Sequence, residues 1–257
     1  TANWALVDGQ GDQVSGVMRT DQLDKRTVPV SYARLVLDAA GAHDVDPASV
    51  LAAAGIAPEV VDGSDERMSV VDIGELLDRA IELTDEPGLG YEIALGSSLL
   101  SQGIIGIGMM TCSSLREAID LGVEFLHLRV PVLSARLRVD GDVAAVSVVE
   151  TVPLGNLRRP LYDLFLVKLA RIGQLLTDNH LRLDDVEIWF DDPEPPYYER
   201  WADRLPPMSF GRGTNELRFP AALLDRRPDT ADPAHARLVE VQCRREVEAL
   251  AGASDVV

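Results

Sequence analysis

The turn signal Asp140-Gly141-Asp142 constrains the fold of this chain more than any other short segment. It lies between two Val-rich runs, Val132 to Val139 and Val143 to Val149. An Asp-Gly pair between two such runs is the strongest short-range signal for a β-hairpin, because the tight turn needs residues that tolerate a positive φ. The sequence therefore predicts an antiparallel hairpin near the middle of the chain.

Helical periodicity precedes the hairpin. Apolar residues recur at helical spacing from Val30 onward, and Ser69 is placed to cap a longer helix. Ser113 or Ser114 caps a further helix, where Glu117 completes a capping box with Ser114. We therefore expect a mainly helical region ahead of the hairpin.

After the hairpin, the pattern predicts one long helix, three short strands and a final helix. The long helix covers residues 157–176, and the final helix begins at Asp232-Pro233. The strands are expected at Val186 to Phe190, Met208 to Phe210 and Glu216 to Phe219. Helices and antiparallel strands are thus segregated along the chain, which is the signature of the α+β class.

These elements indicate how the chain is divided. Residues 1–27 have no hydrophobic period and carry turn formers, so we expect a flexible N-terminal arm there. Residues 28–250 should form the main domain, an N-terminal helical part packed on a small antiparallel sheet with flanking helices. Within it we expect a helical part (28–130), an α+β part (131–225) and a C-terminal helix (232–250).

Composition limits the partners of this chain. Hydrophobic residues make up 46% of its 257 residues, enough for a sizeable core, and its formal net charge is −18. Such a chain repels phosphate backbones and anionic lipids, so we expect neither DNA binding by this polypeptide alone nor a membrane partner. No signal segment is visible, and Cys112 and Cys243 have no disulfide or metal spacing, which favours reduced thiols in the cytoplasm.

Motifs that could carry chemistry have simpler structural explanations. The run Gly103 to Gly108 lacks the order of a nucleotide-binding loop and favours close helix packing over small residues. The four histidines show no metal-ligand spacing, and the doublets Asp184-Asp185 and Asp191-Asp192 are typical of turns and caps. Arg158-Arg159 is interpreted as a surface pair. We therefore predict no catalytic residue, no metal and no cofactor, and hence no enzyme.

Four segments, in order over roughly residues 30–250, resemble a known family. They are VDPASVLAAAGIAPEVV, GIIGIGMMTCSSLREAIDLGVEFLHLRVP, VLSARLRVDGDVAAVSVVE and MSFGRGTNELRFPAALLDRRPDTADPA, of which the last is the most specific. They are similar to the N-terminal, arabinose-binding-like domain of AraC-type transcription regulators, in the branch of ornithine-utilisation and VirS-like regulators.

This resemblance implies an effector-binding domain that also forms a homodimer, in the cytoplasm, within a regulator that controls transcription. The family continues with two helix-turn-helix units of roughly 100 residues in total. Only a short tail follows Leu250 here, so we expect the DNA-binding helix-turn-helix domain to be absent from this chain. The founding arabinose domain is rich in β-structure, whereas this sequence is rich in helical patterns, so sugar binding is not carried over.

We expect a small, hydrophobic effector in a largely apolar cavity between the helices and the sheet. The candidate ligand-binding residues are large side chains on the expected inward faces: Met109, Phe125, His127, Tyr162, Phe165 and Trp189. The amphipathic last helix is the candidate for the dimer interface, through Leu238, Val241 and Leu250.

Two other functions stay open at this point. Helices followed by an antiparallel sheet could hold a haem in a gas sensor, with His127 as the ligand to test. A hydrolase could use the Asp-rich loops, although the sequence shows no nucleophile, base and orienting group to accompany them.

Overall fold

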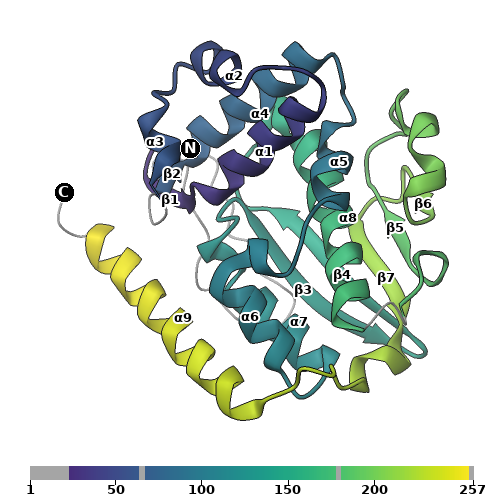
Figure 1. The fold of residues 1–257 in the computed structure, drawn as a ribbon. Helices are drawn as coiled ribbons and strands as arrows, with labels where there is room; N and C mark the ends of the chain where they lie inside the picture. Colours follow the sequence, from purple (N-terminus) through teal and green to yellow (C-terminus); the bar gives the residue numbers. More distant parts are fainter. Residues whose placement is uncertain (1–22, 64–66, 178–180, 255–257) are drawn as a thin grey trace, which may run out of the picture.

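The structure, a computed structural model, describes residues 23–63, 67–177 and 181–254. Its first part is a group of helices at the top of Figure 1, closed by an antiparallel ribbon of β1 (Arg26–Pro29) and β2 (Arg67–Ser69). The helices are α1 (Ser31–Ala42), α2 (Pro47–Ala53), α3 (Glu59–Asp62), α4 (Val70–Thr84) and α5 (Leu89–Leu95).

Polar caps begin two of these helices, α4 at the predicted residue Ser69 and α2 at Asp46. The Ser69 hydroxyl accepts a hydrogen bond from the backbone N–H of Asp72 at the start of α4. Asp46 caps α2 in the same way, with Pro47 at its first position. The apolar faces of α1 to α5 pack together into one hydrophobic core. A second core lies at the sheet.

Helices α6 (Gly103–Thr111) and α7 (Leu115–Glu124) follow. The Ser114 hydroxyl accepts from the N–H of Glu117, whose carboxylate accepts from the N–H of Ser113, which confirms the predicted capping arrangement. Gly108 lets two helices approach closely, because a Cβ there would lie 2.6 Å from Val239 of the last helix. The Gly-rich run is therefore a packing surface, as predicted.

The sheet has the strand order β3-β4-β7-β5-β6. The strands are β3 (Leu133–Asp140), β4 (Val143–Glu150), β5 (Glu187–Trp189), β6 (Met208–Ser209) and β7 (Asn215–Pro220). The register sets Leu137 opposite Val146 and Val146 opposite Leu217, so one face of the sheet is apolar.

The predicted hairpin is confirmed, since Asp140 pairs with Val143 across a two-residue loop in which Gly141 has a φ of 57°. One feature of the sheet differs from the prediction of a purely antiparallel sheet. Strand β6 runs parallel to β5, because residues 190–207 cross over between them and return in the same direction.

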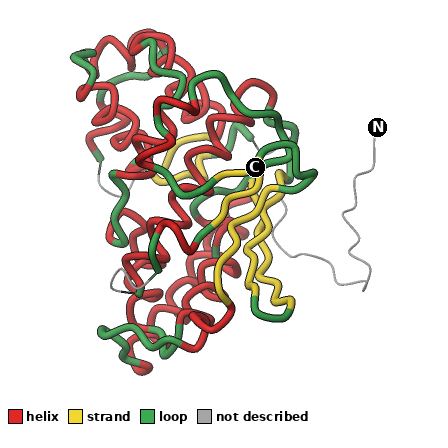
Figure 2. Tube along the Cα trace, turned by 90° about the vertical axis from the view of Figure 1, so that its right-hand side faces the viewer, coloured by secondary structure: helices red, strands yellow, loops and turns green. Residues whose placement is uncertain are grey.

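In the part of the chain that the structure describes, helices cover only the apolar face of the sheet, and Figure 2 shows strands on one side and helices on the other. The long helix α8 (Arg158–Leu176) packs on β7 and on α5, and α9 (Pro233–Ser254) runs along the outside of α6 (Figure 1). Short 3-10 helices connect these elements: η2 (Leu100–Gln102), η3 (Leu126–Leu128), η4 (Gly155–Leu157), η5 (Leu183–Asp185), η6 (Tyr198–Arg200), η7 (Ala202–Arg204) and η8 (Ala221–Asp225).

The α+β class is confirmed, but the hydrophobic cores do not follow the expected division at residue 130. Residues from Val30 to Ile93 make one core, and residues from Tyr91 to Cys243 make the other. Helices α6 and α7 thus belong with the sheet. Strand β1 also begins two residues before the expected start of the domain, while residues 1–22 of the expected arm lie outside the described residues.

Within the described residues, no single helix is long and apolar enough to cross a membrane. The pair Leu89–Leu95 and Leu100–Thr111 passes the same test only when its two parts are joined, and they meet at a bend of 107°.

Candidate ligand-binding site

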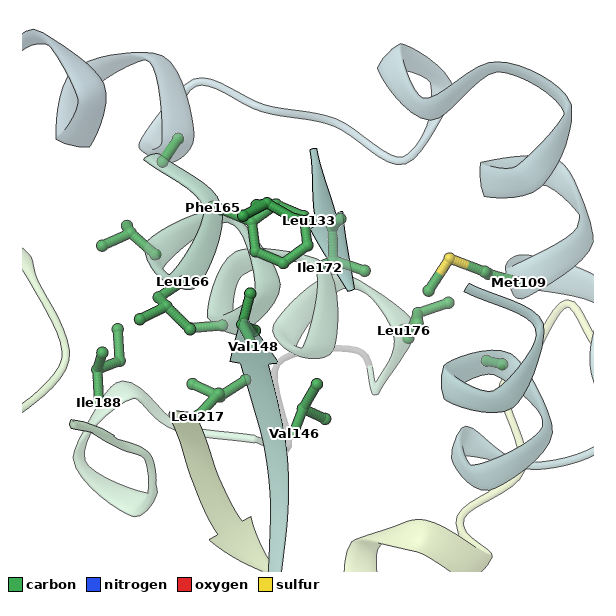
Figure 3. Packing of buried hydrophobic residues seen from close by; sticks show 14 of the residues in the cluster. Met109, Leu133, Val146, Val148, Phe165, Leu166, Ile172, Leu176, Ile188 and Leu217 are labelled. Atoms are coloured by element: carbon green, nitrogen blue, oxygen red, sulfur yellow. The ribbon is translucent and has the colours of Figure 1, made fainter. Parts of the chain in front are cut away.

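The first of two apolar cavities, here called the sheet cavity, lies between α6, α7, α8 and the inner face of the sheet. Its volume is about 90 Å³. Figure 3 shows the side chains from α6, α8 and the sheet that form part of its wall: Met109, Val146, Phe165, Ile172, Leu176 and Leu217. The packed layers therefore leave a space where the sequence places the effector.

The second cavity, here called the helical cavity, lies between α1, α4 and the first half of α8. Its volume is about 100 Å³. Its wall includes Val36, Ile73, Leu77, Leu161 and Leu164. Because α1 and α4 belong to the first core and α8 to the second, this cavity lies on the boundary between the two cores.

Three polar side chains line both cavities: Tyr32 of α1, Arg129 after η3 and Lys168 of α8. We call them the cationic cluster. Gln102 is the one other polar residue in the described wall of the sheet cavity, and every further described wall residue of either cavity is apolar, Gly or Pro. The cluster therefore supplies nearly all the polar chemistry of the site.

The ring of Tyr32 contacts both cations of the cluster. The Lys168 ammonium is 4.5 Å from the centroid of the Tyr32 ring, and the Arg129 guanidinium carbon is 5.2 Å from it. The Lys168 ammonium also donates to the Tyr32 hydroxyl at 3.5 Å, and that hydroxyl donates to Gln102 Oε1 at 3.2 Å. These contacts fix the phenol, but they supply no negative charge.

Burial disfavours the charged form of Lys168 energetically. Its side chain is 3% exposed, and among the described residues no carboxylate forms an ion pair with Lys168 or with Arg129. Burial lowers the pKa of Lys168, and the neighbouring Arg129 lowers it further. Although burial opposes ionisation of Tyr32, the two cations hold the pKa of its hydroxyl below the ordinary value.

The loop before α6 shapes the place of Arg129. Its guanidinium donates to the carbonyl of Ser101 at 3.1 Å, and its Nε is buried without a hydrogen-bond partner. Gly103 has a φ of 60°, and a Cβ there would lie 3.3 Å from the Arg129 guanidinium. A glycine at this turn thus makes room for a cation that still has an unused donor.

The structure brings together two of the six predicted ligand-binding residues. Met109 and Phe165 line the sheet cavity, and Phe165 also lines the helical one. Phe125 and Tyr162 are buried, but they line neither cavity.

The other two predicted residues also line neither cavity. His127 is half-buried in η3, where burial lowers its pKa. Trp189 lies on the outer face of the sheet, with the guanidinium groups of Arg212 and Arg218 4.1 and 4.0 Å from its ring centroid. These four residues stay predictions without a cavity to support them.

The sequence analysis missed all three members of the cationic cluster. For Lys168 a signal existed, because it lies between Phe165 and Ile172 on the apolar stripe of the helix predicted over residues 157–176. A lysine on such a stripe is either paired or functional. No comparable signal marks Tyr32 or Arg129, which reach the site only through the tertiary fold.

Arg158 and Arg159 are not the surface pair that the sequence suggested. Arg158 binds the carboxylates of Glu150, Asp191 and Asp192, which explains that Asp doublet as an ion-pair partner. Arg159 binds Asp163, whose side chain is 1% exposed. In the described part of the chain no group of three His, Cys, Asp or Glu residues could hold a metal ion.

The last helix exposes two of the three residues expected at a dimer interface. Leu238 is 66% exposed and Val241 is 49% exposed, whereas Val239 and Cys243 on the opposite side of α9 are buried. The side chain of Leu250 lies outside the described residues. Near the end of the described side chains of α9, Glu246 forms an ion pair with Arg67 of β2, whose pKa is lowered by burial and by nearby Arg129.

A family model, the arabinose-binding domain at the N-terminus of AraC transcription regulators, matches residues 45–228. The Ornithine utilization regulator of Pseudomonas aeruginosa is 28% identical over 230 residues, 89% of this chain and 66% of that protein. An uncharacterised helix-turn-helix-type transcriptional regulator of Mycobacterium tuberculosis is 23% identical over 225 residues, 84% of this chain and 64% of that protein.

A solved structure has a similar fold. The crystal structure of the transcriptional regulator CdpR from Pseudomonas aeruginosa superposes with a TM-score of 0.54 at 16% sequence identity, over 77% of this chain and 64% of that one. The chain therefore spans about two thirds of the length of the relatives that it matches.

Proposed function

Because the chain belongs to the family of arabinose-binding domains of AraC transcription regulators, we propose that it is the effector-sensing and dimerisation part of such a regulator. The relatives are transcription regulators, which is consistent with a binding role and gives no support to an enzymatic one. The full regulator would control transcription in response to a small molecule that this domain binds.

One observation carries the sensing proposal, namely the pair of apolar cavities that meet at the cationic cluster. A ligand in either cavity would contact α8, and a ligand in the helical cavity would contact both hydrophobic cores. A molecule that binds one arrangement of the two cores better than another shifts the population toward that arrangement. The proposed effector is small and largely apolar, as the walls require.

The ion pair between Arg67 and Glu246 offers a route from the cluster to α9. Burial lowers the pKa of Arg67, and the nearby charge of Arg129 lowers it further. Neutralising Arg129 with a bound ligand would strengthen the hold of Arg67 on Glu246, and so change how firmly α9 is attached. We propose this as the link between the effector and the dimer helix.

A thermal-shift screen with fatty acids, amino acids, sugars and cyclic nucleotides tests the sensing proposal, because a ligand of the native state raises its melting temperature by mass action. Ala135→Phe would fill the sheet cavity from β3 and should reduce the shift. Val149→Phe is the matched control, an enlargement on the exposed face of β4. The sensing role is wrong if no class gives a concentration-dependent shift and mass spectrometry finds no bound molecule.

We do not propose ornithine as the effector, although the name of one relative ties that protein to ornithine utilisation. Ornithine carries two ammonium groups, and the polar groups of this site are themselves cationic. No carboxylate stands among the described wall residues to pair with the ornithine side chain. Ornithine therefore belongs in the screen as an amino acid that should give no shift.

We propose that the chain forms a homodimer through α9, as the family implies, with Leu238 and Val241 in the interface. Their exposure on an outer helix supports this assignment. Leu238→Asp combined with Val241→Asp should convert the dimer to a monomer in light scattering coupled to gel filtration. Leu83→Asp changes an equally apolar, 46% exposed residue on α4 and should leave the dimer intact. A monomeric parent chain would refute the assignment.

DNA binding is assigned to a separate helix-turn-helix part of the full regulator, in the cytoplasm where its target DNA lies. The net charge of −18 on this chain supports that assignment, because phosphate contacts need basic side chains.

A further inference from the structure

Lysine is rare in this chain, and a buried lysine is unusual in any folded protein. Only two of its 24 basic residues are lysines, Lys25 and Lys168, and Lys168 is buried between two apolar cavities. Arg129 lies beside the same tyrosine ring and keeps a buried Nε without a partner. Two cations thus share one apolar site whose described walls contain no carboxylate.

We propose that the cationic cluster is the binding site for the head group of an amphipathic organic anion, a carboxylate whose apolar body occupies an adjoining cavity. This inference rests on the proposed sensing function and names the chemical class of the effector. The carboxylate would accept from the Lys168 ammonium and from the Arg129 guanidinium, beside the Tyr32 ring that both cations contact.

The charges of the site favour an anion. A cationic ligand would meet two like charges in an apolar environment, and a neutral ligand would leave both charges uncompensated. A carboxylate provides the missing counter-charge and accepts hydrogen bonds from the donors present, including the unused Nε of Arg129.

The walls favour a ligand with an apolar body. Beyond the cluster and Gln102, the described walls offer no polar partner to a hydroxyl, amide or ammonium group. A polar group placed there would lose its hydrogen bonds to water without replacement. A sugar or a free amino acid would therefore be a poor ligand, whereas a chain or ring of carbon atoms with one carboxylate matches both parts of the site.

The interactions within the chain do not account for the cluster. The contacts of both cations with the Tyr32 ring offset part of the desolvation penalty of the two buried charges. A neutral side chain at position 168 would have no such penalty to offset. The presence of a lysine at this buried position is therefore explained by an anionic ligand.

The test compares three probes of equal chain length by calorimetry: octanoate, 1-octanol and octylamine. Octanoate should bind about 10- to 100-fold more tightly than 1-octanol, the ratio that charge-assisted hydrogen bonds supply. Octylamine should bind more weakly than either. Lysine labelled with carbon-13 at Cε gives a second measurement, since octanoate should move the resonance of Lys168 and leave that of Lys25 in place.

Lys168→Met keeps the shape of the side chain and removes its charge, so it should abolish the preference for octanoate over 1-octanol. Arg171→Met is the matched control, because Arg171 is a cation on the same helix that lines neither cavity. Its preference should equal that of the parent chain. Circular dichroism of each variant checks that the fold is retained.

The outcomes separate this inference from the proposed function. Equal affinities for octanoate and 1-octanol, or a preference that survives in Lys168→Met, would overturn the anion site and leave the sensing cavity standing. Tighter binding of octylamine would overturn it as well. If none of the three probes binds, the carboxylate assignment is wrong, and the metabolite screen decides separately whether the domain senses another molecule.

Discussion

At the scale of single residues, Lys168 shows where local pattern and tertiary environment disagree. Its position on α8 follows the apolar stripe that packs on the sheet, yet its side chain ends in an ammonium group. A buried, unpaired charge destabilises a folded chain, and such residues are retained where function needs them. Lys168→Met should therefore stabilise the ligand-free protein by about 1–4 kcal/mol.

The pH dependence of stability reports the same residue. The pKa of Lys168 is lower in the folded chain than in the unfolded one, so the unfolded chain binds more protons between these two values. The free energy of unfolding should then rise with pH in that range, and the advantage of Lys168→Met should shrink toward pH 10. Urea unfolding of both proteins from about pH 7 to 9.5 measures this. A constant difference would contradict the lowered pKa.

Asp163 shows the opposite behaviour, a buried charge with its partners in place. It accepts from Arg159 Nε at 2.8 Å and from the Tyr197 hydroxyl at 2.6 Å, while burial raises its pKa against the effect of both partners. Asp163→Ala leaves Arg159 without its carboxylate and should destabilise the fold by about 3–5 kcal/mol.

The control for this prediction is the exposed pair of Glu75 and Arg79, which has the same four-residue spacing. Because water screens that pair, Glu75→Ala should lower the free energy of unfolding much less than Asp163→Ala does. Denaturant unfolding of the two variants gives both values. Equal losses would mean that burial is not what sets the strength of the Asp163 contacts.

At the scale of elements, the crossing of α5 and α8 depends on one glycine. A Cβ at Gly90 would lie 2.8 Å from the carbonyl oxygen of Pro160, which is backbone and cannot move aside as a side chain can. Gly90→Ala should therefore force the helices apart and destabilise the chain by about 1–3 kcal/mol.

Gly41, in α1, provides the contrast, since nothing lies within 4 Å of a Cβ built there. Gly41→Ala should stabilise the chain by about 0.5–1 kcal/mol through better helix propensity. Thermal unfolding of the two alanine variants should move in opposite directions. A shift of the same sign in both would show that the close approach at Gly90 is unimportant.

Elements with strong local signals begin within one or two residues of the predicted position. The hairpin follows from Asp140-Gly141, and α4 and α9 follow from Ser69 and Asp232 as caps. Strand β6 has only two residues, and its parallel pairing with β5 depends on a crossover that no local signal marks. The tertiary fold determines which strands pair when they lie far apart in sequence. For this reason the direction of β6 differed from the predicted antiparallel arrangement.

At the scale of the whole molecule, the negative net charge opposes binding to DNA. With 42 acidic and 24 basic residues, it should give no band shift with duplex DNA at about 150 mM salt, because non-specific affinity comes from phosphate neutralisation. A gel-shift titration with the purified chain checks this. A shifted band at micromolar protein would place a DNA-binding surface on this domain.

The sequence by itself determined the α+β class, most helices and strands, the acidic character and the family, because each of these depends on local periodicity, caps or an ordered set of segments. Met109 and Phe165, two of the residues that the sequence predicts for ligand binding, line the sheet cavity.

Only the tertiary structure decided that the helices divide between two cores and that Tyr32, Arg129 and Lys168 meet at their boundary. These residues lie on elements separated by tens of residues, and no periodicity reports the distance between their side chains. The uncompensated charge at the site exists only once packing has removed those side chains from water.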